Sequence, residues 1–308
     1  MSAGWVAGGV RAHALLSRRL GATGARDLAL AAGLDDAVRR LADGPYGRGL
    51  RPGMDLPAIE HAVGAGLLWQ LRVLAGWQPR AGAQVVRLLA GWFVLANIVD
   101  HARELAGADH APVYRLGALD NGWSHLAGTA SAAALRAGLA ESPWGDPGGT
   151  SASAIALAGQ VSWAARVADG VPVAADWAAG ALALVAARVW FAGAEHPPDA
   201  VAARVADLLG VDPRGQESLA EFAAALRPRA RWALSDVVEP ERLWLAEAGW
   251  WARLERDGGS LTRATTFGAA PLAGCVALLA VDAWRVRAAL QMVAAPGADG
   301  SVVFDVLV

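Results

Sequence analysis

The sequence predicts an all-α protein, and three observations support this fold class. The chain is 55% hydrophobic and rich in alanine and leucine, which are strong helix formers. Apolar residues recur at helical spacing, as Leu34, Val38 and Leu41 do. The alternation of apolar and polar residues that is typical of strands is almost absent before residues 301–308, which we expect to form a short extended segment.

A helical unit over residues 34–104 is the element that the rest of the chain repeats. Its first short helix ends in turn residues at 43–47, which cannot continue a helix. Asp55 and Pro57 predict the start of a long helix, because aspartate is a good N-cap and proline fits the first helical turn. The expected helices of this part of the chain cover residues 5–20, 25–32, 34–41, 55–76 and 83–105.

The turn that ends the first short helix recurs later in the sequence. Residues 41–47 are Leu-Ala-Asp-Gly-Pro-Tyr-Gly and residues 139–145 are Leu-Ala-Glu-Ser-Pro-Trp-Gly, an offset of 98 positions (139 minus 41). Leu28 and Leu126 match at the same offset. Coincidence in an alanine-rich chain is the alternative, but the shared acidic, proline, aromatic and glycine positions favour an internal repeat.

The repeat predicts three similar helical modules that share a core or are packed around a central axis. The first covers residues 1–110, the second 111–196, and the third 197–308, which is a more diverged copy with a C-terminal tail. A period near 100 residues exceeds that of common solenoid repeats, so a solenoid is not expected. The expected helices of the second and third modules cover residues 151–167, 174–191, 199–209, 217–226, 229–238, 239–256 and 271–295.

Charge and composition exclude several classes of function. A net charge of −2 favours neither a nucleic-acid-binding surface nor an acidic tail. All 27 basic residues are arginine, and the absence of lysine excludes a lysine phosphate clamp and a Schiff base. The 14 tryptophans indicate extensive packing between helix faces, with some available to anchor a partner.

The single cysteine and the longest uncharged stretch bear on the cellular compartment. Cys275 alone excludes an intramolecular disulfide and lies in an apolar run, which indicates a small buried residue in a reducing compartment. No signal peptide is expected, because residues 1–10 lack a positively charged start. The uncharged stretch 264–281 contains Pro271 and Gly274, so we expect a core helix rather than a transmembrane span.

No catalytic, metal-binding or cofactor-binding residue is predicted. His101 and Glu104 lie one helical turn apart, but no second pair completes a metal site. Asp35 and Asp36 are followed by arginines and are better explained as a solvated helix face. Residues 145–150 are glycine-rich but follow no predicted strand, so a linker is favoured over a phosphate-binding loop.

The two similar turns supply the predicted partner contacts. Tyr46, Arg48 and Arg51 belong to the first turn and the link after it, and Trp144 belongs to the second turn. Aromatic and arginine side chains in exposed loops are the types that anchor protein interfaces. Ordinary packing of the turns is the alternative explanation for these residues.

Five motifs follow one another in an order that is similar to a known family. They are the run 10–20, the turn 41–47, the helix start 55–60, the pair Asn97-Ile98 and the stretch 271–280. In this order and spacing they resemble the C subunit of V/A-type rotary ATPases, whose eukaryotic relative is subunit d. The likeness extends over most of the chain, including its three-module plan.

The sequence departs from the family pattern at three places. Val94 stands where an acidic residue is expected, three positions before Asn97. The long helix of the second module lacks the corresponding asparagine. In the last helix, residues 285–290 stand where the family has a charged run of the form Glu-x-x-Asn-x-Arg. These departures weaken the expectation that this chain contacts its partners as typical members do.

The resemblance implies a funnel-shaped, non-catalytic spacer in the central stalk of a rotary ATPase. Its partners would be the rotor shaft subunits and the membrane ring of proteolipid subunits. It would transmit torque between ATP synthesis or hydrolysis and the transport of hydrogen or sodium ions. The resemblance also implies a cytoplasmic protein that is peripheral to the membrane, associated with it through partners and without a transmembrane helix or cofactor of its own.

A function from another class remains open from the sequence. The chain could be a helical small-ligand-binding protein or enzyme with a site inside an apolar bundle. A pocket with several ionisable residues of perturbed pKa would favour this alternative. An unrelated helical scaffold is a third interpretation.

Overall fold

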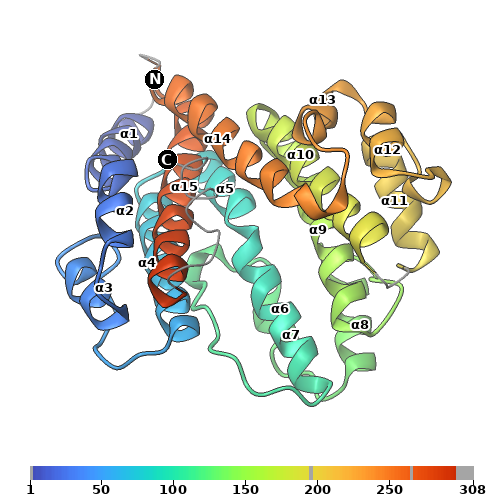
Figure 1. The fold of residues 1–308 in the computed structure, drawn as a ribbon, viewed down its shortest axis with the longest axis horizontal. Coiled ribbons are helices and arrows are strands. Elements are labelled where there is room, and N and C mark those ends of the chain that lie inside the picture. Colours follow the sequence, from blue (N-terminus) through green and yellow to red (C-terminus); the bar gives the residue numbers. More distant parts are fainter. Residues whose placement is uncertain (1–2, 194–196, 264–265, 296–308) are drawn as a thin grey trace. The chain divides into compact units, whose positions relative to one another are not determined.

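The computed structural model describes residues 3–193, 197–263 and 266–295, and every regular element in these ranges is a helix (Figure 1). The predicted all-α class is therefore confirmed. The extended segment expected at residues 301–308 lies outside the described residues.

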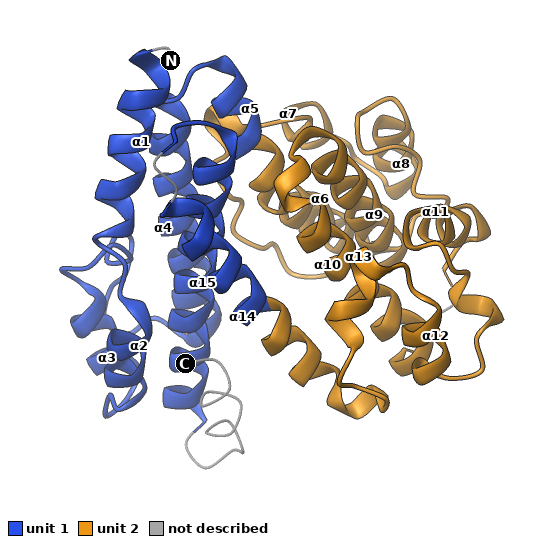
Figure 2. Cartoon of the chain, turned by 90° about the horizontal axis from the view of Figure 1, so that it is seen from above, with its two compact units in different colours: residues 1–86, 251–308 blue, residues 87–250 orange. Residues whose placement is uncertain are grey.

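The chain divides into two compact units, coloured separately in Figure 2. Unit 1 comprises Met1–Val86 and Trp251–Val308, and unit 2 comprises Arg87–Trp250. Helices α5 (Arg80–Leu89) and α14 (Leu243–Thr262) contain the two points of division. The three modules expected at 1–110, 111–196 and 197–308 do not coincide with these units, and the three-module plan stays a prediction.

Unit 1 is built around its last helix, α15 (Ala269–Ala294), which contacts four helices from the start of the chain. An apolar surface on all sides suits a helix surrounded by others, and α15 is buried along most of its length. The surrounding helices are α1 (Ala3–Leu16), α2 (Gly21–Ala29), α3 (Leu34–Leu41) and α4 (Leu56–Gly76).

Unit 2 is centred on the paired helices α9 (Ala152–Gly170) and α10 (Ala175–Ala187). Glycine permits close packing here, because a Cβ at Gly159 would lie 2.2 Å from the Leu95 side chain. The other helices of this unit are α6 (Gly91–Leu105), α7 (Trp123–Leu126), α8 (Ala132–Ala140), α11 (Asp199–Leu209), α12 (Leu219–Ala225) and α13 (Pro228–Arg231). Short helical turns are η1 (Gly117–Leu119), η2 (Pro172–Ala174), η3 (Arg188–Ala192), η4 (Pro213–Gly215), η5 (Trp232–Leu234) and η6 (Pro240–Arg242).

The helix expected over residues 83–105 is wrong as one continuous element. It is divided into α5 and α6, which are bent by 43°. The Trp163 indole nitrogen donates to the Leu88 carbonyl oxygen at 3.0 Å, and a Cβ at Gly91 would lie 2.8 Å from the Trp163 ring. A side chain inserted into the backbone ladder is a common cause of a helix kink.

Two stretches, Pro172–Ala192 and Ala269–Ala294, are long and apolar enough to cross a membrane by length and composition, and the bent pair α5 and α6 would be a third if it formed one span. In α15 the most apolar window is 78% buried within the structure, against 56% for the Pro172–Ala192 window. The core position expected for the stretch before Asp282 is therefore what the structure shows.

The start and end of α4 also match the prediction closely, with Asp55 accepting from the Ala58 amide as N-cap.

Candidate partner-binding turns and ligand pockets

The first turn follows α3 and folds its aromatic side chain inward. The Gly44 amide donates to the Leu41 carbonyl oxygen at 3.0 Å, and the Gly47 amide donates to the Gly44 carbonyl oxygen at 3.3 Å. Tyr46 is completely buried between these bonds. Gly47 is required by close approach, because a Cβ there would lie 1.9 Å from the Ala42 carbonyl oxygen.

A carboxylate in the middle of α15 fixes this turn. Asp282 is 2% exposed, and its Oδ2 accepts from the Tyr46 hydroxyl at 2.8 Å. The same carboxylate accepts from the Leu20 amide at 3.0 Å and from the Gly21 amide at 2.7 Å, which are the first amides of α2. One buried side chain therefore joins the core helix, the start of α2 and the first turn.

The Tyr46 phenol acts as the donor in this arrangement. Burial raises its pKa well above the ordinary value, and the neighbouring negative charge of Asp282 raises it further. Arg19 opposes this effect only in part. The hydroxyl consequently keeps its proton at physiological pH and donates a hydrogen bond to the carboxylate.

An ion pair lies one helical turn beyond Asp282. Both terminal nitrogens of Arg285 contact the Glu255 carboxylate at 2.6 Å, and the Arg285 side chain is only 7% exposed. The hydrogen bonds from Arg285 lower the pKa of Glu255 despite its partial burial. Arg285 is therefore engaged inside unit 1 rather than presented to a partner.

The second turn, after α8, repeats the backbone pattern of the first. The Ser142 amide donates to the Leu139 carbonyl oxygen at 3.0 Å, and the Gly145 amide donates to the Ser142 carbonyl oxygen at 3.2 Å. Both bonds lie 98 positions after their counterparts in the first turn. Trp144, at the position of Tyr46, is 1% exposed.

Different chemistry holds the second turn. The Trp144 carbonyl oxygen accepts from the buried Ser162 hydroxyl of α9, and Arg204 donates to that hydroxyl oxygen at 2.8 Å. The Arg166 guanidinium lies 5.2 Å from the centre of the Trp144 ring, a cation–π arrangement. Burial lowers the pKa of Arg166 and of Arg204, although both stay charged at neutral pH.

The expectation that all four predicted partner-binding residues are exposed is wrong for the two aromatics. Tyr46 and Trp144 are buried, because each turn folds its aromatic ring inward, where the ring packs in the local core. Arg48 and Arg51 are exposed, as expected. The structure thus leaves the two arginines of the first link as available contact residues.

Arg48 borders a pocket of about 210 Å³ in unit 1. Its guanidinium lies 5.3 Å from the centre of the Trp69 ring on α4. Gln70, also on α4, is 3% exposed, and its Nε2 has no hydrogen-bond partner among the described residues. Arg18, just after α1, completes the polar lining.

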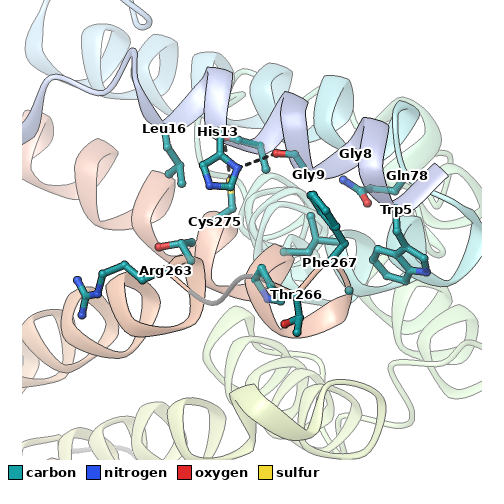
Figure 3. A pocket seen from close by; sticks show the side chains of 15 residues that line it. Trp5, Gly8, Gly9, His13, Leu16, Gln78, Arg263, Thr266, Phe267 and Cys275 are labelled. Carbon is teal, nitrogen blue, oxygen red and sulfur yellow. Dashed lines mark hydrogen bonds between the residues drawn. The ribbon is translucent and has the colours of Figure 1, made fainter. Parts of the chain in front are cut away.

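A second pocket in unit 1, of about 250 Å³, lies between α1 and the start of α15 (Figure 3). His13 lines it, and its Nδ1 lies 2.9 Å from the Gly9 carbonyl oxygen. The Phe267 ring packs so closely on α1 that a Cβ at Gly9 would lie 2.5 Å from it. Cys275 also lines the pocket, and burial raises the pKa of its thiol to about 12, so it is not a thiolate nucleophile at neutral pH.

The acidic and histidine candidates have structural partners. His101 Nε2 lies 3.1 Å from the Thr129 carbonyl oxygen, and Asp35 accepts from the Gly53 amide at 2.7 Å. In the linker 145–150, Asp146 pairs with Arg136 at 2.8 Å, and this hydrogen bond lowers the pKa of Asp146 to about 2. Within the described ranges there is no group of three or more His, Cys, Asp or Glu residues that could hold a metal ion.

Sequence reasoning missed the residues that hold the two turns, and it missed the buried Gln70 beside Arg48. Asp282 had a signal, because a single carboxylate within a long apolar helix requires hydrogen-bond donors nearby. Ser162 and Gln70 had none, since serine and glutamine are ordinary residues on a partly exposed helix.

Comparisons of the chain with models of known protein families and with curated proteins find no match.

Proposed function

We propose that this protein is a non-catalytic spacer subunit in the central stalk of a V/A-type rotary ATPase. It would connect the rotor shaft to the membrane proteolipid ring and transmit torque for ATP-coupled proton or sodium transport. This role places it at the cytoplasmic face of the membrane, held there by its partners. Arg48 and Arg51 are the proposed partner contacts.

The observation that carries the proposal is the pair of turns with matched backbone hydrogen bonds. Their 98-residue offset and buried aromatics support the internal repeat on which the family resemblance depends. The support for the repeat comes from these two turns alone. The arrangement in three modules is part of the proposal.

Rigid attachment of the first turn also supports a mechanical role. Torque transmission needs a partner-binding loop that does not yield relative to the helices behind it. Asp282 ties this turn to α15 and α2 by three hydrogen bonds, and Arg48 follows Tyr46 by only two residues. A charged contact residue on a fixed loop suits such a subunit better than one on a mobile loop.

The proposal is tested by affinity purification of the tagged full-length protein from gently solubilised native membranes, followed by mass spectrometry. We expect shaft, head and proteolipid subunits in fixed ratios. The double variant Arg48→Glu with Arg51→Glu should recover them at least tenfold less well, because charge reversal opposes an acidic partner surface. Arg26→Glu, which changes an exposed arginine on α2, should recover them normally.

Recovery of the protein alone, with the ATPase subunits present in the starting membranes, would contradict the spacer role. Recovery of the subunits with equal yield from the double variant would retain the role and reject the assigned contact residues.

Binding of a small apolar ligand is a second candidate function, favoured by the pocket of about 250 Å³ beside Cys275. The protonated thiol and the largely apolar lining suit binding rather than catalysis. Titration with a fluorescent fatty acid tests this candidate. Leu16→Trp, which fills the pocket from a half-buried position, should reduce binding, and absence of saturable binding to the unmodified protein would reject it.

A further inference from the structure

The pocket beneath Arg48 has an unusual combination of polar groups. It lies between the end of α1, the first turn and α4, and all of its lining residues belong to unit 1. Its volume of about 210 Å³ suits a small polar group rather than a large apolar ligand. The residues that define it are Leu15, Arg18, Pro45, Arg48, Trp69 and Gln70.

Gln70 lines this pocket and carries an unused hydrogen-bond donor. Its side chain is 97% buried, and the amide nitrogen lacks a hydrogen-bond partner among the described residues. An unpaired buried donor destabilises a protein, so native structures rarely keep one without a reason. An acceptor in the pocket would remove this cost.

The pocket is also positively charged without a compensating carboxylate. Arg18 and Arg48 line it, and no acidic residue does. Within the described part of the chain neither guanidinium forms an ion pair. Other arginines of unit 1 do form ion pairs, as Arg40 does with Asp36 and Arg285 does with Glu255.

We propose that this pocket binds the oxyanion of a small ligand, a phosphate or a carboxylate. Gln70 Nε2 donates to one oxygen from the floor, and Arg18 and Arg48 hold the charge at the mouth. The Trp69 ring keeps the Arg48 side chain in place and shields one wall of the site. The inference shares Arg48 with the proposed partner contacts, but it does not need the spacer role and depends only on the geometry of unit 1.

The test is titration of the purified full-length protein with inorganic phosphate and, separately, with succinate, in low-salt buffer that contains neither. Nitrogen-15 NMR follows the side-chain amide of Gln70, assigned by its loss in Gln70→Leu. We expect saturable movement of this resonance with at least one anion. Preference between the two anions then distinguishes a phosphorylated from a carboxylated ligand.

Matched variants separate this site from general anion attraction. Arg48→Gln and Arg18→Gln should each weaken binding about tenfold, because each removes a charge-assisted contact. Arg26→Gln, which changes an exposed arginine of α2 that does not line the pocket, should bind as the parent does. Gln70→Leu should bind at least fivefold more weakly while melting at the same or a higher temperature, because it removes an unpaired polar group of similar shape.

Three results would count against the proposal. One is the absence of saturable movement of the Gln70 resonance with either anion. A second is equal weakening by Arg26→Gln and Arg48→Gln, which would indicate general electrostatic attraction. A lower melting temperature in Gln70→Leu would count against the unpaired donor, since it would indicate an internal partner.

Discussion

The two turns of this protein have the same backbone hydrogen bonds and buried aromatic position but are held by different side chains. In the first turn a phenol donates to a carboxylate of the core helix α15. In the second a serine of α9 holds the backbone carbonyl of Trp144, with two arginines beside it. The comparison teaches that two turns can share the path of the chain and the bulk of a buried ring while different polar groups fix them.

The glycines at the end of the two turns also differ in what requires them. Gly47 is needed because the Ala42 carbonyl oxygen would meet a side chain at 1.9 Å. Gly145 instead has a φ of +76°, the left-handed region that glycine adopts at low cost, and a Cβ would have space around it. Glycine is thus required at the corresponding position of each turn for a different physical reason.

The largest effect is expected from Asp282→Ala. It leaves the Tyr46 hydroxyl and two α2 amides without their acceptor in a buried site, so the free energy of unfolding should fall by about 4 kcal/mol. Urea denaturation followed by circular dichroism measures this change. A loss below 1 kcal/mol would show that the carboxylate does not fix the first turn.

The glycine pair should separate in the same assay. Gly47→Ala forces a clash with backbone and should reduce the free energy of unfolding by about 3 kcal/mol. Gly145→Ala strains only the local φ and should reduce it by about 1 kcal/mol. Equal losses would contradict the two explanations.

Ser162→Ala should have a smaller effect than Asp282→Ala. It removes a neutral hydroxyl, and the loss of its bond to the Trp144 carbonyl oxygen should reduce the free energy of unfolding by about 1–2 kcal/mol. If this variant loses as much as Asp282→Ala, the two turns are held equally strongly and the contrast fails.

The Arg285–Glu255 pair should make stability depend on acid pH. The pKa of Glu255 is lowered from its ordinary value of 4.5, so the pair contributes fully above that pH and its contribution is lost as the pH falls below it. At pH 7, Glu255→Gln should reduce the free energy of unfolding by about 1 kcal/mol, since the partly exposed carboxylate is screened by solvent. The difference from the parent should shrink towards pH 3, and a constant difference would exclude this origin.

Much of the helical fold was accessible from sequence, because helix starts and turns have local causes. The N-cap at Asp55 and the proline after it predicted the start of α4. The division of α5 from α6 was not accessible, since it depends on Trp163, which lies far away in the chain. The exposure of Tyr46 and Trp144 was wrong for a related reason, because turn residues are usually at the surface and only the packing behind them buries their rings.

The candidate pockets could not have been predicted. The pocket beneath Arg48 joins Arg18, Arg48 and Gln70 from three separate segments, and no spacing in the sequence relates them. Asp282 was the one accessible clue to the buried network, but its partners lie more than 230 positions earlier in the chain.

The most direct test of the contrast between the turns is a pair of double-mutant cycles on the free energy of unfolding. The first combines Tyr46→Phe with Asp282→Asn, and the second combines Trp144→Phe with Ser162→Ala. We expect an interaction energy of about 1–2 kcal/mol in the first cycle, because the phenol and carboxylate bond directly, and about 0.3 kcal/mol or less in the second, because Ser162 bonds only to the Trp144 backbone. Equal interaction energies in the two cycles would contradict the claim that only the first turn is fixed by a hydrogen bond from its aromatic side chain.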